Sequence, residues 1–262
     1  MSRVEHIGDA TLYLGEAIET LRVFADPVDC IITDPPYCSG AATEAGKGSA
    51  THQGLRSETI RSGRFSWFEA DNMTTSGLCA LLRGVGVQAV RLLPSGGSML
   101  VFCDWRMAFM LGPEIESAGL RLRNLVVWDK GHFGCGTGFR PRHELALHLS
   151  KRSPEFHAAD VGNVIRCERV GEQAREHETE KPVGLLSEMV RVVCPPDGIV
   201  CDPFMGSGTT GVACASLGRH FIGIEREPRH FETACRRIDD AQRQGRLFDQ
   251  PRPQPMQEAM AL

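Results

Sequence analysis

Residues 30–37 read CIITDPPY, and this stretch decides the fold class. Its apolar half is typical of a buried parallel strand, and two consecutive prolines cannot extend a strand ladder. Open α/β sheets bind ligands at the carboxyl ends of their strands, so we expect the motif at a binding edge that suits a planar amine. An ordinary proline-terminated strand with a turn tyrosine is the alternative. The candidate catalytic residues are Asp34, Pro35, Pro36 and Tyr37.

A second motif lies far downstream, where residues 198–210 read GIVCDPFMGSGTT. A strand ends in an acid, a Gly-x-Gly turn follows, and a helix begins near Thr209. Glycines let the backbone approach a ligand closely, and a helix N-terminus favours an anion. After the next strand comes Glu225, about 20 residues beyond the turn, where an acid usually binds ribose hydroxyls. The pattern predicts half of a nucleoside-binding Rossmann unit.

Three ligands compete for this unit. A phosphate-binding P-loop ends in Gly-Lys-Ser/Thr, which the Gly-Thr-Thr found here does not match. The dinucleotide fingerprint fits the spacing of Gly206, Gly208 and Gly211, so an NAD-dependent oxidoreductase is one interpretation. S-adenosylmethionine is another, with a ribose for Glu225 and a zwitterionic end suited to a helix N-terminus and a lysine. NAD leaves the DPPY motif unexplained.

The chain has 262 residues, 42% of them hydrophobic, and a formal net charge of −4. This length allows one large α/β domain or two small ones, and the composition is ordinary for a globular enzyme. No stretch approaches the ~20 apolar residues of a transmembrane helix, and the N-terminus does not resemble a secretory signal. The ten cysteines never form C-x-x-C, so we expect reduced thiols in a cytoplasmic protein. The histidines lack metal-site spacing, and no metal is predicted.

Hydrophobic periodicity predicts alternating strands and helices. The expected strands span residues 4–7, 28–33, 98–103, 120–128, 145–149, 198–201 and 220–224. The expected helices span residues 14–24, 78–93, 105–118, 182–193, 208–217 and 229–242. Between them lie a long loop at 39–63, a glycine-rich hairpin end at 131–138 and a polar, irregular segment at 152–176. The Pro- and Gln-rich tail is predicted to be disordered.

The DPPY motif, a later Lys-Pro, the DPFMGSGTT motif and the Ile-Gly-x-Glu of residues 222–225 together resemble the permuted, β-class amino-methyltransferases of DNA. The similarity covers residues 6–240. It implies an α/β fold of the permuted Rossmann-like, S-adenosylmethionine-dependent methyltransferase type, with a mixed, mostly parallel sheet and helices on both faces. The implied organisation is one domain (1–245) with a catalytic half (1–150), a short target-recognition region (151–176), a cofactor half (177–245), a DNA-contacting loop (39–66) and a disordered tail (246–262).

The resemblance implies S-adenosylmethionine as cofactor, S-adenosylhomocysteine as product and no metal. Gly8-Asp9 resembles the family's acid that faces the cofactor adenine, although Asp is also a good helix cap. Residues 177–182, HETEKP, resemble the family segment H-P-T-x-K-P with Glu178 in place of proline, and Lys181 would pair with the cofactor carboxylate rather than lie on the surface. The expected cofactor-binding residues are Asp9, Lys181, Asp202, Pro203, Phe204, Gly206, Ser207, Gly208, Thr209, Thr210 and Glu225.

The activity implied by the resemblance is site-specific methylation of N6 of an adenine flipped out of duplex DNA. Asp34 and the Pro35 carbonyl would accept the two N–H bonds of the amine, and Tyr37 would stack on the base, at roughly 1–3 kcal/mol. Cytosine N4 is the alternative target, and the family's cytosine members more often carry Ser in place of Asp34. Methylation of RNA or of a protein amide, and a catalytically inactive DNA-binding regulator, are further alternatives.

Two basic segments are candidates for DNA contacts, although either would also suit a solvated face. Residues 47–64 and 130–152 each carry several basic side chains and a single acid. The expected DNA-binding residues are Lys47, Arg56, Arg61, Arg140, Arg142, Lys151 and Arg152. The implied partners are double-stranded DNA, a second copy of the chain and a cognate restriction endonuclease, in a protein of bacterial or phage origin.

Overall fold

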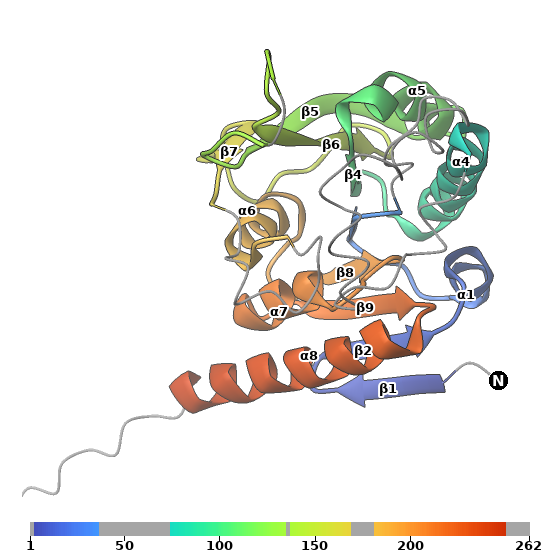
Figure 1. Ribbon diagram of the computed structural model, residues 1–262. Helices are drawn as coiled ribbons and strands as arrows, with labels where there is room; N and C mark the ends of the chain where they lie inside the picture. Colours follow the sequence, from blue (N-terminus) through green and yellow to red (C-terminus); the bar gives the residue numbers. More distant parts are fainter. Residues whose placement is uncertain (1–2, 37–73, 135–136, 169–180, 250–262) are drawn as a thin grey trace, which may run out of the picture.

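Nine strands form one mixed sheet in the computed structural model, which describes residues 3–36, 74–134, 137–168 and 181–249 (Figure 1). Their order across the sheet is β1-β2-β9-β8-β3-β4-β6-β5-β7. The strands are β1 (Arg3–Ile7), β2 (Ala10–Leu14), β3 (Cys30–Thr33), β4 (Ser98–Cys103), β5 (Arg121–Asp129), β6 (His143–Ser150), β7 (Val164–Arg166), β8 (Ile199–Asp202) and β9 (His220–Glu225).

Helices cover both faces of this sheet (Figure 1). One face carries α1 (Ala17–Val23), α4 (Thr75–Leu92) and α5 (Trp105–Glu116). The other carries α6 (Val183–Val193), α7 (Thr209–Ser216) and α8 (Pro228–Asp249). Successive strand residues point to opposite faces, so Ile31 of β3 lies in the first core and Ile32 in the second. The predicted fold class, a mostly parallel sheet with helices on both faces, is confirmed.

Both motifs lie at one edge of the sheet. The strands β2, β9, β8, β3 and β4 run parallel, so their carboxyl ends meet at this edge, which we call the carboxyl edge. Because β6 is antiparallel to β4, and β5 to β6, the start of β6 and the end of β5 lie there too. Strand direction therefore brings residues 34, 130, 144 and 206 to the same side of the molecule.

An antiparallel hairpin stands at the N-terminus, where the sequence predicted a strand followed by a helix from residue 14. Residues 10–14 form β2, which pairs with β1 from Ile7↔Ala10 to Arg3↔Leu14, and α1 begins only at Ala17. In β2, Ala10 and Leu12 are buried while Thr11 is half-exposed. That alternation is the period of a strand, and the helical interpretation overlooked it.

The C-terminal half also differs in detail from the prediction. Helix α8 extends through Asp249, so residues 246–249 of the predicted disordered tail are helical, and residues 250–262 lie outside the described part. The segment predicted as irregular at 152–176 contributes β7, which pairs with the end of β5. Among the described helices, none is long and apolar enough to cross a membrane.

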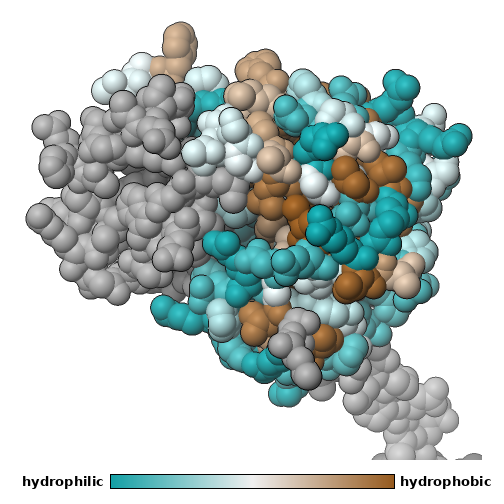
Figure 2. Space-filling model, turned by 90° about the vertical axis from the view of Figure 1, so that its right-hand side faces the viewer, coloured by the Kyte–Doolittle hydropathy of each residue, from teal (hydrophilic) through white to brown (hydrophobic). Residues whose placement is uncertain are grey.

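The layer formed by α1, α4 and α5 carries hydrophobic side chains in separate groups among hydrophilic ones (Figure 2). Scattered exposed apolar residues are normal on protein surfaces, so this layer does not by itself indicate a site. The exposed apolar side chains on these helices are Val23, Val87, Trp105, Phe109 and Met110.

Candidate active site

A chain of alternating charges lies at the carboxyl edge. The Nζ atom of Lys181 is 2.5 Å from Oδ2 of Asp34 and 3.2 Å from Oε2 of Glu144. Glu144 in turn forms an ion pair with Lys130. Lys130 and Lys181 are 8% and 5% exposed, so both charges are buried. The sequence predicted that Lys181 pairs with a cofactor carboxylate, whereas in the structure its ammonium contacts the DPPY aspartate.

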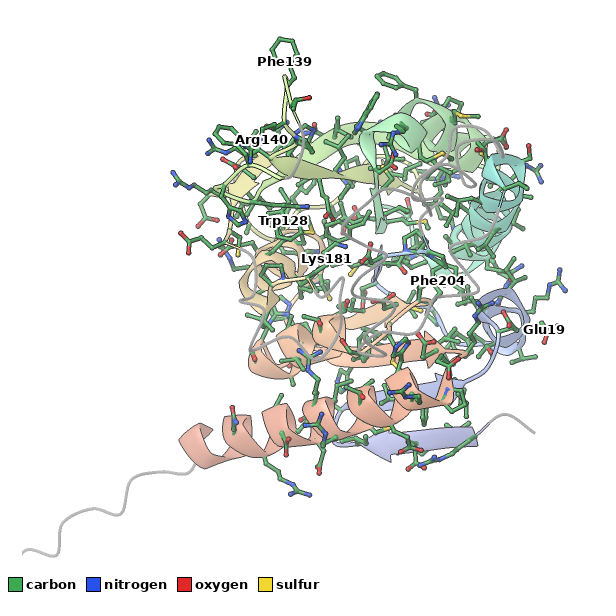
Figure 3. All side chains as sticks on the ribbon, in the orientation of Figure 1. Glu19, Trp128, Phe139, Arg140, Lys181 and Phe204 are labelled. Atoms are coloured by element: carbon green, nitrogen blue, oxygen red, sulfur yellow. The ribbon has the colours of Figure 1, made fainter. Side chains whose placement is uncertain are left out.

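The carboxyl ends of β3 and β5, the first residues of β6 and the start of α6 position these four side chains. Asp34 directly follows β3, Lys130 follows β5, and Glu144 is the second residue of β6. Lys181 directly precedes the N-cap residue of α6, and Figure 3 shows it in the interior of the molecule. Each ammonium also lies over an aromatic ring, at 4.9 Å from the Trp128 centroid for Lys130 and at 5.0 Å from the Phe102 centroid for Lys181.

Burial and opposite charge compete in setting the pKa values of this cluster. Burial raises the pKa of Glu144, but the ammonium groups of Lys181 and Lys130 outweigh it and leave that pKa below its usual value. Burial lowers the pKa of Lys181, while the carboxylates of Asp34 and Glu144 raise it above its usual value. Both groups are therefore charged at neutral pH, and the two acids balance the two lysines.

Asp202 joins the two motifs from inside. Its Oδ1 accepts hydrogen bonds from the Thr33 hydroxyl at 2.6 Å and from the Phe204 amide at 3.0 Å, and its Oδ2 accepts one from the Thr210 hydroxyl at 2.7 Å. Burial raises the pKa of Asp202 to about 6, although these hydrogen bonds lower it. Because both oxygens bond to the protein's own groups, this carboxylate ties β3, β8 and α7 together. The side chain of Asp202 thus has a structural role, and its predicted contact with the cofactor stays a prediction.

The glycine turn after β8 is open to a ligand at its first glycine. Gly206 has a φ of +53°, and a Cβ there would meet nothing within 4 Å. Gly208, with a φ of +82°, is the N-cap of α7, and a Cβ there would lie 3.0 Å from Cα of Ala234. A Cβ at Gly211 would lie 2.5 Å from Cδ1 of Ile238. The second and third glycines are therefore required by packing against α8, whereas the first, Gly206, faces open space in which a ligand could approach the backbone.

Helix α8 holds the hydroxyl groups of the same turn. Arg237 donates to the carbonyl and hydroxyl oxygens of Ser207, at 3.0 and 2.8 Å, and to the Thr209 hydroxyl at 3.2 Å. Ser207 and Thr209, which were predicted to bind the cofactor, thus shape the turn through their side chains. Pro203 is buried, and Phe204 is half-buried and packs against the core of the α1, α4 and α5 face (Figure 3).

Glu225 ends β9 next to the turn. Its Oε2 accepts a hydrogen bond from the Gly206 amide at 3.0 Å, and its Oε1 accepts one from the Glu227 amide at 2.7 Å. Burial raises the pKa of Glu225, and the hydrogen bonds from these amides partly offset the rise. The side chain is half-buried and lies where the sequence placed a ribose-binding acid.

Asp9 lies at the opposite edge of the sheet, which corrects its predicted contact with the cofactor adenine. It occupies the turn between β1 and β2, and its carbonyl accepts from the amide of Phe221 near the start of β9. A second Gly-acid pair, Gly15-Glu16, follows β2 at the carboxyl edge. The Gly15 amide donates to the Glu225 carbonyl at 2.9 Å, and Glu16 is the N-cap residue of α1. Glu16 is therefore the acid that shares an edge with Glu225.

The basic residues predicted to contact DNA divide between the two edges. Arg140 and Arg142 lie in the β5–β6 loop at the carboxyl edge, whereas Lys151 and Arg152 follow the end of β6 at the opposite edge. The antiparallel direction of β6 causes this separation and places Lys151 and Arg152 away from the Asp34 edge, while their contact with DNA stays a prediction. The other predicted residues Tyr37, Lys47, Arg56 and Arg61 lie outside the described part of the chain.

Sequence reasoning missed Lys130, Glu144 and Glu16 as site residues. Glu144 is the single acid in a basic segment and stands at the start of an apolar strand. A buried acid needs a charged partner, so its isolation among basic residues was the available signal. Glu16 was hidden because the first of two Gly-acid pairs was chosen. Among the described residues, no group of three His, Cys, Asp or Glu side chains could hold a metal ion.

Comparison with known proteins identifies a family and several relatives of this chain. The family model N6_N4_Mtase, described as DNA methylase, matches residues 28–236. The type II methyltransferase M.HinfI of Haemophilus influenzae is 28% identical over 262 residues, which cover 89% of this chain and 70% of that protein. The type II methyltransferase M2.MboI of Moraxella bovis is 27% identical over 249 residues, which cover 87% of each.

Solved structures match the same extent of the chain. The M1.HpyAVI–SAM complex has a TM-score of 0.65 and 25% identity, and the match covers 88% of this chain and 99% of that one. The cytosine-N4-specific PvuII DNA methyltransferase has a TM-score of 0.66 and 16% identity, covering 91% and 93%. At that identity the second likeness concerns the fold alone.

Proposed function

Since the chain belongs to the N6/N4 family of DNA methylases, we propose that it transfers a methyl group from S-adenosylmethionine to the exocyclic N6 amino group of an adenine in duplex DNA. The observation that carries the proposal is the placement of the two motifs on neighbouring strands, β3 and β8. Asp34 follows the first strand and the Gly206 turn follows the second. The hydrogen bond between Thr33 and Asp202, at 2.6 Å, fixes the two motifs relative to each other.

The residues around Gly206 fit the proposed methyl donor. The open backbone at Gly206 allows close approach, and half-buried Glu225 retains acceptor capacity for ribose hydroxyls beyond its two amide bonds. Glu16 adds a second acid at the same edge, on the side of β2. The N-terminus of α7 suits the carboxylate of the methionine portion. When bound there, S-adenosylmethionine supplies a methyl group on a positively charged sulfur.

Asp34 addresses the main chemical difficulty, because the lone pair of a nucleobase amine is delocalised into the ring. Its carboxylate and the Pro35 carbonyl would accept the two N–H bonds, which makes the nitrogen more tetrahedral and directs its lone pair toward the methyl group. A carboxylate cannot deprotonate a neutral aryl amine beforehand. It would instead orient the amine and stabilise the positive charge that develops on nitrogen. The amine proton leaves with or after methyl transfer.

Lys181 and Glu144 support Asp34 in this mechanism. A carboxylate accepts several hydrogen bonds, so Asp34 can hold the Lys181 ammonium and an amine N–H together. An unbalanced ammonium next to the reacting nitrogen would oppose its developing positive charge. Glu144, at 3.2 Å from Lys181, balances that charge. Glu144 thus acts as a positioning residue through Lys181.

A paired base is out of reach of Asp34, so the target base must leave the duplex, at a cost of a few kcal/mol. Tyr37 follows the DPP turn in sequence and would stack on that base. Adenine is favoured over cytosine because the position occupied by Asp34 more often carries Ser in cytosine-specific enzymes of the family. Cytosine N4 remains the alternative product of the same chemistry.

The test is transfer of a labelled methyl group from S-adenosylmethionine to unmethylated DNA. We expect the wild type to label DNA and Asp34→Ala to lose at least roughly 10²–10³-fold in kcat, with the Kd for S-adenosylmethionine nearly unchanged. Asp9→Ala is the matched control, because this acid lies at the opposite edge, and it should keep wild-type turnover. Wild-type turnover by Asp34→Ala would contradict the mechanism, and failure of the wild type to label any DNA would contradict the function.

A further inference from the structure

The loop between β5 and β6 projects from the molecule and ends in a bare phenylalanine (Figure 3). We call residues 131–134 and 137–142 of this loop the arm. Phe139, at its tip, has a relative exposure of 109%, which is that of a side chain without any neighbours. It follows Gly138, whose φ of +71° makes the turn. The fold gains no packing from this ring.

Hydrogen bonds brace the stem of the arm. Arg142 binds both oxygens of Asp129, at 2.7 and 2.8 Å, and its carbonyl accepts from the Lys130 amide at 3.0 Å. Further along, the Gly134 amide donates to the Pro141 carbonyl at 2.7 Å. A side chain at Gly134 would lie 2.9 Å from that carbonyl, so glycine permits this close crossing. These bonds therefore brace the stem of the arm as far as Gly134 and Pro141.

Two arginines and a second aromatic ring form the middle of the arm. Arg140 donates from Nε to the Gly134 carbonyl at 2.8 Å. The guanidinium carbons of Arg140 and Arg142 lie 5.6 and 5.9 Å from the Phe133 centroid. Arg140 remains exposed, while Asp129 neutralises Arg142. Within the described part of the chain no acid pairs with Arg140, so the arm presents a positive charge directly beside its apolar tip.

The base of the arm lies next to the charged residues of the candidate active site. Lys130 precedes the arm, and Glu144 follows it by one residue. Glu144 contacts Lys181, which contacts Asp34. The arm therefore rises from the carboxyl edge where the target base would bind, and its position relative to Asp34 is set by β5 and β6.

We propose that the arm engages the DNA duplex, with Phe139 inserted between base pairs next to the extruded base and Arg140 on a backbone phosphate. This inference rests on the proposed function. Apolar wedges such as Phe unstack a base step and are stabilised by the contacts that the deformed duplex permits, and arginine–phosphate contacts set the position on the duplex. A bare ring on a positively charged arm with a hydrogen-bonded stem has the chemistry for this role.

The test compares Phe139→Ala, Phe139→Leu and Arg140→Ala on two duplexes that carry the sequence methylated by the wild type. In one the target base is paired, and in the other it stands opposite an abasic site, where extrusion costs less. Phe156→Ala is the matched control, because Phe156 is also exposed but follows β6 at the opposite edge. The Phe139 and Arg140 variants should keep wild-type stability, and all variants should keep wild-type affinity for S-adenosylmethionine.

We expect Phe139→Ala to raise the Kd for the paired duplex about tenfold, which equals about 1.4 kcal/mol, and to raise it less for the abasic duplex. Phe139→Leu should keep most of the affinity, and Arg140→Ala should weaken both duplexes equally and reduce the salt dependence. The wedge role of Phe139 would be wrong if Phe139→Ala had the same Kd for the paired duplex as Phe156→Ala. It would also be wrong if Phe139→Ala raised the Kd for both duplexes by the same factor. A wild type that methylates no DNA would contradict the proposed function first, and the inference with it.

Discussion

At the scale of single residues, the site depends on charges buried in pairs. Lys181 and Glu144 are separated in sequence by 37 positions, yet their charged atoms lie 3.2 Å apart. The sequence predicted Asp34 because its motif is contiguous, and Lys181 because residues 177–182 resemble a segment of the family. For Glu144 the sequence offered one signal, a lone acid in a basic segment, but its contact with Lys181 depends on the direction of β6. Residues in contiguous motifs can therefore be predicted from the sequence, whereas the residues that balance their charges can be identified only once the strand topology is known.

Glu144→Gln tests this balance. It leaves two buried ammonium groups with one carboxylate, and breaking a buried pair costs about 3–5 kcal/mol. We expect denaturant titration to give a lower free energy of unfolding. We also expect kcat to fall while KM changes little. Adding Lys130→Met removes the surplus charge and should restore much of the stability without restoring kcat. If Glu144→Gln has wild-type kcat, or if the double variant regains activity, the positioning role of Glu144 is wrong.

At the scale of elements, the strand–turn units were predicted well because each combines an apolar run with a proline or glycine stop. The N-terminal hairpin was not. The segment ATLYLGEAIETL contains both a period-2 strand and a period-3.6 helix, and the two share Leu14. Pairing of β2 with β9 decides between them, and this pairing joins segments about two hundred residues apart. Only tertiary structure could place the acid at residue 16, rather than residue 9, at the carboxyl edge.

The shift from Asp9 to Glu16 has a direct test in cofactor binding. Glu16→Ala removes an acid beside the Glu225 strand end, so we expect the Kd for S-adenosylmethionine to rise by about tenfold, the effect of one hydrogen bond to a charged group. Asp9→Ala should leave that Kd unchanged. Isothermal titration calorimetry measures both. If Asp9→Ala raised the Kd for S-adenosylmethionine and Glu16→Ala did not, Asp9 rather than Glu16 would be the acid that contacts the cofactor.

At the scale of the whole molecule, the fold class, the edge that carries the site and the family were predictable from two motifs and their order. The catalytic motif precedes the cofactor motif in sequence, and β3 and β8 nevertheless lie side by side. The assignment of basic residues to DNA was less predictable, because β6 carries residues 143–152 from one edge of the sheet to the other. Residues close in sequence, such as Arg142 and Lys151, therefore end at opposite edges.

The loss of folding stability at low pH depends in part on His148. The ring is 4% exposed and lies 3.0 Å from the Ser98 hydroxyl, and burial, with the charge of Arg123, lowers its pKa from 6.5 to about 4. The unfolded chain takes up this proton at higher pH than the folded one. The contribution is thus complete above pH 6.5 and is lost as the pH falls through 4. We expect the wild type to lose on the order of 2 kcal/mol more than His148→Gln between pH 7.5 and 5.

Urea unfolding at several pH values measures this difference. Asp202 titrates in the opposite sense, because its raised pKa of about 6 makes its contribution complete below 3.8 and lost as the pH rises through 6. Wild type and variant share that effect, so subtraction isolates His148. Parallel stability curves for the two proteins would show that His148 protonates normally in the folded state.

If Asp34 orients an exocyclic base amine, the methylated nucleoside identifies that amine. The most direct measurement is to treat unmethylated DNA with the enzyme and labelled S-adenosylmethionine, digest the product to nucleosides and separate them. We expect label in N6-methyldeoxyadenosine, and none with Asp34→Ala. Label in N4-methylcytosine would correct the target base and keep the chemistry. Label on a ring carbon, on RNA only, or on no nucleoside at all would show that the chain does not methylate an exocyclic base amine of DNA.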